Sequence, residues 1–263
     1  MLRSLCFALL AAAAVAVDPV LYIFSPECYD TLLVKFDIMG FLVPECLKFT
    51  ISKGLGYAII VGALILKVPQ IKNILSSGSV EGLATGTFYA DVLTFFVGSL
   101  YSFKQGYPIS TYGEELVILT QNLALVLLMW KYREFSALHK VSVLGIFCGM
   151  AFYGLQLDAA HPIIQALPNI TICTTVLARA PQVVANYQNG STGQLSLVTT
   201  VLNSLGSVAR VFTTLQELDD FKKLMGYVVS LSLNVMLILQ MVMYWTATNA
   251  ATKASKKASK KSE

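Results

Sequence analysis

The sequence predicts an all-α integral membrane protein in which seven transmembrane helices form two parallel three-helix repeats joined by a linker helix (3+1+3). Three observations support this fold class: an apolar composition, an internal repeat, and a series of long apolar segments. The 263 residues are 56% hydrophobic and 13% charged, and their mean hydropathy is +0.66. Such a chain has too little polar surface for a soluble globular protein.

A Pro-Gln motif defines the internal repeat. Lys67-Val68-Pro69-Gln70 returns as Arg179-Ala180-Pro181-Gln182, at an offset of 112 residues. The same offset matches further residues across about three apolar segments: Gly78-Ser79 with Gly190-Ser191, Asp91 with Asn203, Asn122 with Asn234, and Tyr132 with Tyr244. A fixed offset of this kind indicates a duplicated architecture.

The chain begins with a region that precedes the repeats. Residues 1–17 hold one Arg and an Ala-rich apolar run, which is typical of a signal peptide, with a retained anchor as the alternative. Residues 18–52 mix apolar and acidic residues, so we expect a lumenal or interfacial segment. Cys28 and Cys46 lie in this segment. In an oxidising lumen they could form a disulfide, and two unpaired buried thiols are the alternative.

Seven apolar segments follow, each long enough to cross a hydrocarbon core of about 30 Å as a helix. We expect spans at residues 53–75, 83–103, 113–132, 141–157, 163–184, 195–215 and 224–245. The first repeat then covers 53–132, the linker helix 141–157 and the second repeat 163–245. Because four crossings separate equivalent helices, both repeats are predicted to point the same way across the membrane.

Charge predicts the orientation. Most loop lysines and arginines, and five lysines of the tail 246–263, fall on one side of the predicted membrane, and most acidic residues fall on the other. The positive-inside rule therefore predicts a lumenal N-terminus and a cytosolic C-terminus. The net charge of +4 is explained by this topology, without nucleic-acid binding. The chain ends with Lys260-Lys261-Ser262-Glu263, which resembles the dilysine retrieval signal of endoplasmic reticulum membrane proteins.

Two matched motifs are candidate hinges. A proline inside a spanning helix removes a backbone hydrogen bond and kinks the helix, and a neighbouring glutamine can bond a freed carbonyl. We therefore predict hinges at Pro69-Gln70 and Pro181-Gln182. The alternative is that both prolines end their helices at the cytosolic surface.

Polar residues inside the predicted spans are candidates for substrate binding. An aspartate such as Asp91 at the centre of a transmembrane helix raises the free energy of membrane insertion by about 2.5 to 3.5 kcal/mol. Asp91 therefore needs a partner or a water-filled cavity. We predict Arg210 as its counter-ion. Asn122 and Asn234 are predicted to face each other across the repeat axis, and Asn203 completes the predicted polar cleft. The alternative is a set of structural contacts that only hold the helices together.

No residue constellation indicates catalysis or metal binding. The five cysteines lack C-x-x-C spacing, and neither His139 nor His161 lies near a convincing nucleophile. We therefore predict no catalytic residue, no metal and no cofactor, and a non-enzymatic role.

The paired Pro-Gln motifs, each followed by a Gly-Ser turn, resemble the PQ-loop family. That family includes cystinosin-type lysosomal exporters and is related to the SWEET sugar transporters. Between Cys28 and Trp245, further strings are similar to the branch that is required for mannose-P-dolichol utilization: Ser52-Lys53-Gly54-Leu55-Gly56, Ser79-Val80-Glu81-Gly82-Leu83, and residues 186–196 and 209–217.

The resemblance implies a protein of the endoplasmic reticulum membrane that lets lumenal enzymes use dolichol-phosphate-mannose and dolichol-phosphate-glucose. These donors serve N-glycan assembly, mannosylation and GPI-anchor synthesis. The implied partners are membrane lipid, dolichol-linked monosaccharides and lumenal glycosyltransferases. A facilitator would hold the headgroup in the polar cleft, with Arg210 near the phosphate. Two alternatives remain: a proton-coupled exporter of a small solute with Asp91 as its protonatable carboxylate, and a scaffold whose polar residues serve only assembly.

Overall fold

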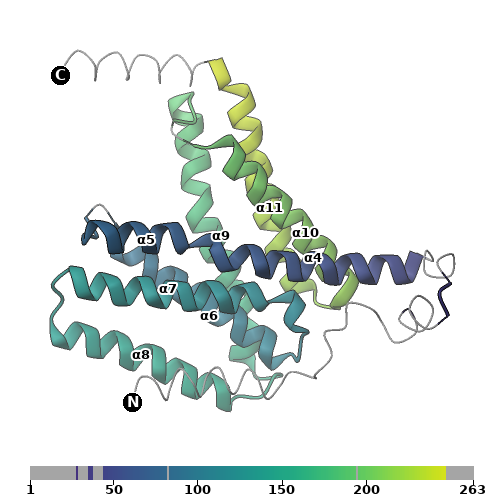
Figure 1. Cartoon of the computed structure of the whole chain (residues 1–263), viewed down its shortest axis with the longest axis horizontal. Coiled ribbons are helices and arrows are strands. Elements are labelled where there is room, and N and C mark those ends of the chain that lie inside the picture. Colours follow the sequence, from purple (N-terminus) through teal and green to yellow (C-terminus); the bar gives the residue numbers. More distant parts are fainter. Residues whose placement is uncertain (1–27, 29–34, 38–43, 82, 194, 247–263) are drawn as a thin grey trace. The chain divides into compact units, whose positions relative to one another are not determined.

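The computed structural model describes residues 28, 35–37, 44–81, 83–193 and 195–246. Within these residues all regular structure is helical, and no strand occurs (Figure 1). The expected signal-like segment 1–17, most of the segment 18–52 and the Lys260-Lys261 signal lie outside the described residues. The all-helical prediction is therefore confirmed for the part of the chain that the structure describes.

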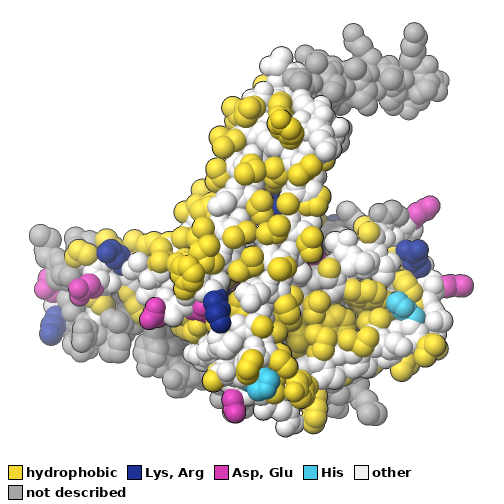
Figure 2. Space-filling view, turned by 180° about the vertical axis from the view of Figure 1, so that it is seen from behind, with side chains coloured by type: hydrophobic (Ala, Val, Ile, Leu, Met, Phe, Trp, Pro, Cys, Tyr) yellow, Lys and Arg dark blue, Asp and Glu magenta, His cyan; other side chains and the backbone are white. Residues whose placement is uncertain are grey.

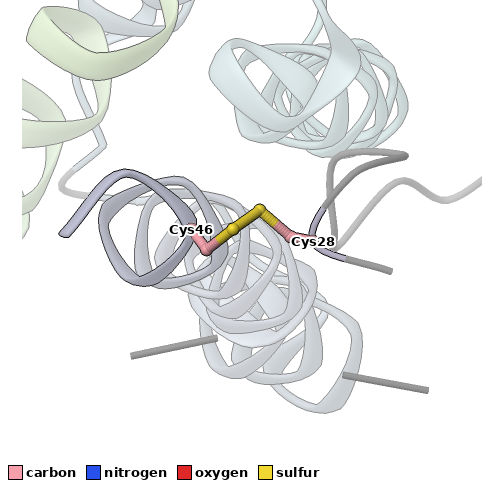
Figure 3. Close-up of a disulfide and its surroundings, with 2 residues drawn as sticks. All are labelled: Cys28 and Cys46. Atoms are coloured by element: carbon pink, nitrogen blue, oxygen red, sulfur yellow. A yellow bond between two sulfur atoms is a disulfide. The ribbon is translucent and has the colours of Figure 1, made fainter. Parts of the chain in front are cut away.

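The chain divides into two compact units, residues 1–54 and residues 55–263. In the first unit, a disulfide joins Cys28 to Cys46, with their Cα atoms 5.6 Å apart (Figure 3). Cys46 lies in the first turn of helix α4 (Pro44–Leu66), which begins with a proline. Proline suits the start of a helix because the first amides have no partner inside the helix. Of the two alternatives left open by the sequence, the structure contains the bridged pair.

The second unit contains the end of α4 and the remaining helices. These are α5 (Val68–Ser77), α6 (Thr85–Lys104), the short 3-10 helix η2 (Ile109–Thr111), α7 (Gly113–Tyr132), α8 (Ala137–Gln156), α9 (Pro162–Asn189), α10 (Leu197–Glu217) and α11 (Phe221–Met243). Helix α7 coincides with the predicted span 113–132. Helix α4 begins nine residues before the predicted span 53–75 and α9 ends five residues after 163–184, because helices can continue through polar residues outside a hydrocarbon core.

Two apolar clusters position the helices of the second unit. One lies among α5, α6 and α7 and includes Ile74, Phe88 and Leu125. The other joins α6 to α9 through Val97, Leu100, Tyr101, Ile164 and Leu167. In addition, α11 packs against α9 and α10 (Figure 1). The α6–α9 cluster connects the two repeats, so a site between them is held by packed side chains.

Helix length and surface composition indicate a multi-pass membrane protein. Among the described residues, five helices are long and apolar enough to cross a membrane: Pro44–Ser77, Gly113–Tyr132, Ala137–Gln156, Pro162–Asn189 and Phe221–Met243. The expectation was seven spans. Helices α6 and α10 have 20 and 21 residues but carry more polar side chains, so composition alone does not mark them. Hydrophobic side chains cover much of the face seen in Figure 2, and Leu138, Leu177 and Val198 are about 70% exposed or more.

Candidate functional site

The first PQ segment, Lys67 to Gln70, lies at a break between two helices. Helix α4 ends and α5 begins on either side of Lys67, and Pro69 and Gln70 lie in the first turn of α5. The side chain of Gln121 on α7 fills the break: it accepts a hydrogen bond from the Lys67 backbone amide (3.1 Å) and donates to two α4 carbonyl oxygens (2.9 Å each). A side chain from α7 therefore satisfies backbone groups that the break exposes.

The second PQ segment, Arg179 to Gln182, lies inside an unbroken helix, because α9 continues through Pro181. The Gln182 amide donates to Asn186 Oδ1 (2.8 Å), and the buried Asn186 amide donates to Gln240 Oε1 (3.0 Å). Gln240 Nε2 returns to the Val183 carbonyl oxygen (2.8 Å). These bonds join α9 to α11. The function of either segment as a hinge stays a prediction.

The prediction that Arg210 is the counter-ion of Asp91 is wrong. Asp91 is about one-third exposed and pairs with Lys67, whose Nζ lies 3.2 Å from Asp91 Oδ2. Arg210 is buried and forms its ion pair with Glu114, and its Nη1 donates to the Ser110 carbonyl oxygen at 2.9 Å. The reason is the packing of α10 against η2, which brings Arg210 to the beginning of α7 rather than to the middle of α6.

The three predicted asparagines have different environments. Asn234 Nδ2 donates to Ser207 Oγ at 3.2 Å, so it links α11 to α10. Asn122 is fully buried in α7, and neither atom of its amide has a hydrogen-bond partner among the described residues. Asn203 is exposed on α10. No hydrogen bond joins Asn122 to Asn234 in the described part of the chain, and the role of these residues in substrate binding stays a prediction.

A buried cluster of charges lies elsewhere, where the beginnings of α7 and α11 approach the helix α10. We define the charged cluster as Glu114, Glu115, Arg210 and Lys223. Glu114 pairs with Arg210, and Lys223 Nζ lies 3.9 Å from Glu115 Oε1. All four side chains are at most 15% exposed. The cluster joins α7 of the first repeat to α10 and α11 of the second, and its two carboxylates balance its two cations.

Neutral side chains surround Lys223 and Glu115. The Lys223 ammonium bonds the hydroxyl of Ser102 and lies 5.7 Å from the ring centres of both Tyr107 and Tyr112. Tyr227 donates a hydrogen bond to Glu115 Oε1 (3.4 Å). An ammonium near aromatic rings gains cation–π attraction, which offsets part of the cost of burying it.

Asp220 anchors the beginning of α11 next to this cluster. Its Oδ1 accepts from the backbone amides of Lys222 (2.9 Å) and Lys223 (3.1 Å), and its Oδ2 accepts from the hydroxyls of Tyr101 and Tyr107 (2.8 Å each). Burial alone would raise the pKa of Asp220, but these hydrogen bonds outweigh burial and lower the pKa below its ordinary value. Burial and the bond to Asp220 raise the pKa of Tyr107. Asp220 is therefore held as a carboxylate.

A cavity of about 250 Å³ opens beside the charged cluster. It lies among α6 and α7 of the first repeat and α9 and α11 of the second. Its lining includes the charged residues Glu114, Glu115, Lys222 and Lys223, the aromatic residues Phe95, Tyr101 and Tyr227, and the hydroxyl residues Thr171, Thr175 and Ser230. None of Asp91, Asn122, Asn203, Arg210 and Asn234 lines it. The geometry thus provides a pocket between the repeats with mostly apolar walls and a few charged and hydroxyl groups, at a place that sequence reasoning missed.

Comparison with known proteins agrees with the internal repeat. The family model described as PQ loop repeat matches residues 51–111 and 163–223. The chain therefore contains two segments that match the PQ loop repeat. The two matched ranges are separated by the same 112 residues as the Pro-Gln motifs. The chain is also similar to human Solute carrier family 66 member 3, with 25% identity over 179 residues that cover 68% of this chain and 87% of that relative.

One sequence signal could have led to this cavity. Glu114 and Glu115 are among the acidic residues on the predicted lumenal side. The 112-residue offset places Glu115 on Tyr227, and the structure joins these two residues by a hydrogen bond. The offset likewise places Gly98 on Arg210. Polar residues that align between repeats, at the ends of the predicted spans, mark positions where the repeats meet.

Proposed function

We propose that this protein is a non-enzymatic membrane protein of the endoplasmic reticulum that presents or moves dolichol-phosphate-mannose and dolichol-phosphate-glucose for lumenal glycosyltransferases. These donors would serve N-glycan assembly, mannosylation and GPI-anchor synthesis. The observation that carries the proposal is the cavity between the repeats, whose lining includes the polar groups of Glu115, Lys223 and Tyr227. The choice of a lipid-linked sugar rests on the similarity to the branch required for mannose-P-dolichol utilization.

A dolichol-linked sugar has a polar headgroup and an apolar chain, and the protein offers a surface for each. A sugar phosphate cannot lie in hydrocarbon without partners for its polar groups, whereas the dolichol chain belongs there. The cavity supplies polar partners, and the exposed apolar faces of the helices supply a surface for the chain. Lys222, which is exposed and lines the cavity, supplies a positive charge for the phosphate.

The proposed orientation places the N-terminus in the lumen and the C-terminus in the cytosol. The Cys28–Cys46 disulfide supports this orientation, because disulfides persist in the oxidising lumen and are rare in the cytosol. The Lys260-Lys261 sequence supports residence in the endoplasmic reticulum. Replacing both lysines by alanine is expected to move the protein along the secretory pathway, which fluorescence microscopy of the tagged full chain would detect.

A second candidate function is proton-coupled export of a small solute. The similarity to a protein named as a solute carrier favours it, and so do the buried carboxylates of Glu114 and Glu115 at the cavity. These two residues suit the role better than Asp91, because Asp91 is partly exposed and lies outside the cavity lining.

Reconstitution in liposomes tests both functions. Purified full-length protein is placed in liposomes with a short-chain dolichol-phosphate-mannose, and impermeant periodate reports how much mannose is accessible outside. We expect protein to accelerate exchange between leaflets, or to accelerate mannosylation by a co-reconstituted mannosyltransferase. Liposomes with heat-denatured protein are the control. If the protein accelerates neither leaflet exchange nor mannosylation, and a pH gradient drives efflux of a small solute instead, the second function replaces the first.

A further inference from the structure

The cavity has the size of a small polar molecule. Its volume is about 250 Å³, which is below the roughly 300 to 1,000 Å³ of pockets for drug-sized ligands. At about 30 Å³ per water molecule, it holds about eight waters. A single hexose ring with its hydroxyl groups would displace several of these waters.

Charge balance restricts what can enter. The two carboxylates of Glu114 and Glu115 already face the two cations of Arg210 and Lys223. A buried charge that lacks a partner is strongly unfavourable, so a charged group added to this balanced set would leave one charge uncompensated. Next to the charged cluster, the cavity therefore favours an occupant without net charge, and the exposed Lys222 is the charged residue of the described lining that stands outside this balance.

The lining also matches the two kinds of surface on a sugar. Phe95, Tyr101 and Tyr227 offer aromatic rings to the apolar face of a pyranose ring, and Thr171 and Ser230 offer hydroxyls to its edge. Pockets with mostly apolar walls and a few placed polar groups are typical of small-molecule sites.

One carboxylate oxygen of this lining is unsatisfied in the part of the chain that the structure describes. Glu115 Oε1 accepts from Tyr227 and faces Lys223, but Glu115 Oε2 is buried and has no hydrogen-bond partner among the described residues. Oε2 lies against Gly98, where a Cβ atom would be only 2.7 Å away. The absence of a side chain at Gly98 is therefore what lets this carboxylate take its position at the cavity.

We propose that the cavity binds an uncharged hexose ring, with Glu115 accepting hydrogen bonds from ring hydroxyls and Gly98 making room for Glu115. The inference rests on the proposed function in one respect: for a lipid-linked sugar, the sugar enters the cavity and the phosphate stays outside, at the exposed Lys222. Glu115 is then the residue that determines sugar recognition, and the predicted contact of the phosphate with Arg210 does not form.

Equilibrium binding to the purified protein in nanodiscs tests this inference. The probes are radiolabelled methyl α-mannoside and methyl α-glucoside, with mannose 1-phosphate and inorganic phosphate as competitors. We expect saturable binding of the glycosides, competition by mannose 1-phosphate, and none by inorganic phosphate. Glu115→Gln is expected to weaken binding by about tenfold or more, since a hydrogen bond to a charged acceptor is lost. Phosphate competition, or wild-type affinity in Glu115→Gln, overturns the proposal.

A pair of glycine variants on α6 tests the position of Glu115 without changing the charge of any residue. Gly98→Ala is expected to weaken glycoside binding because it displaces Glu115, whereas Gly86→Ala on the same helix has nothing within 4 Å of its new Cβ and is expected to bind as the wild type does. Equal binding by both variants contradicts the proposal. If glycosides bind as expected but liposomes show no lipid exchange or transferase stimulation, the site stands and the proposed function fails. If liposomes show lipid exchange or transferase stimulation but the glycosides do not bind, the proposed site fails and the proposed function stands.

Discussion

The two PQ segments share a sequence pattern and differ in their backbone. The first is broken at Lys67, where Gln121 bonds the exposed backbone groups, and the second continues through Pro181. The 112-residue offset explains the difference. The counterpart of Gln121 is Leu233, which has no amide to offer, while Asn186 and Gln240 of the second repeat correspond to Ile74 and Leu128 of the first. Proline permits a break, but the residue on the neighbouring helix decides whether it forms.

The repeats also differ in how their charges are used. In the first repeat, Lys67 and Asp91 form a partly exposed pair. Their counterparts in the second repeat are Arg179 and Asn203, which cannot form an ion pair. The buried pair instead crosses between repeats, from Glu114 to Arg210, at a position whose counterpart in the first repeat is Gly98. Matched positions thus carry different residues in the two repeats, and some of these residues form the contacts between the repeats.

The largest effect is expected from Arg210→Met. It leaves Glu114 buried without its cation, and breaking a buried pair costs about 3 to 5 kcal/mol. Lys67→Met, which breaks the partly exposed pair in the first repeat, is expected to cost at most about 1 kcal/mol. Unfolding free energies from denaturant titration in mixed micelles would measure both. If both variants lose the same unfolding free energy, the buried pair does not stabilise the protein more than the partly exposed pair.

The next effect tests the broken helix. Gln121→Leu introduces the residue that the second repeat has at this position, and leaves the Lys67 amide and two α4 carbonyl oxygens without Gln121. Each buried backbone group without a partner costs about 1 to 3 kcal/mol, so we expect a loss of about 2 to 4 kcal/mol. Gln188→Leu, at an exposed position on α9, is the control. A loss no larger than in this control would show that Gln121 does not stabilise the break.

A smaller effect distinguishes the beginnings of α7 and α11. Asp220 caps α11 and accepts from two tyrosines, whereas the residue at the start of α7, Tyr112, makes no side-chain cap. Asp220→Ala is expected to cost about 2 kcal/mol at neutral pH, from the lost cap and tyrosine bonds. The neighbouring exposed Asp219→Ala is the control.

The same variant predicts a pH dependence. Folding lowers the pKa of Asp220 from its ordinary value of 3.8. Its stabilisation is therefore fully present above that value and is lost as the pH falls through the lowered pKa. The stability difference between wild type and Asp220→Ala should be constant from neutral pH to about pH 5 and should shrink at lower pH. A difference that grows on acidification would contradict the assignment.

The smallest effect is expected when the second repeat is given the residues of the first. Asn186→Ile combined with Gln240→Leu replaces both partners of a buried hydrogen bond by apolar groups, which can be nearly neutral, so we expect a change within about 1 kcal/mol. Gln240→Leu alone should cost more, because Asn186 loses its acceptor. If the double variant is less stable than Gln240→Leu alone, the hydrogen bonds of the two amides stabilise the protein more than the packing of the apolar side chains that replace them.

The sequence predicted the helices better than the site, for physical reasons. Apolar periods and turn residues are local signals, so the span 113–132 coincides with α7, and the left-handed Gly190 (φ 57°) ends α9. Helix α4 begins nine residues before the first predicted span, because the helix continues through polar residues such as Glu45. The partner of Arg210 could not be found in this way, because Glu114 lies 96 residues away and only the packing of α10 near η2 brings them together.

Photo-crosslinking tests the central claim that the ligand site is the cavity at Glu115 and Lys223, and not the predicted cleft of Asp91, Asn122 and Asn203. The full-length protein in nanodiscs is irradiated with a short-chain dolichol-phosphate-mannose carrying a diazirine on the sugar, and peptides are identified by mass spectrometry. We predict adducts on the cavity lining, at Thr171 on α9 and Tyr227 on α11, that excess methyl α-mannoside prevents. Competed adducts at Asn122 or Asn203, with none in the lining, would contradict the account.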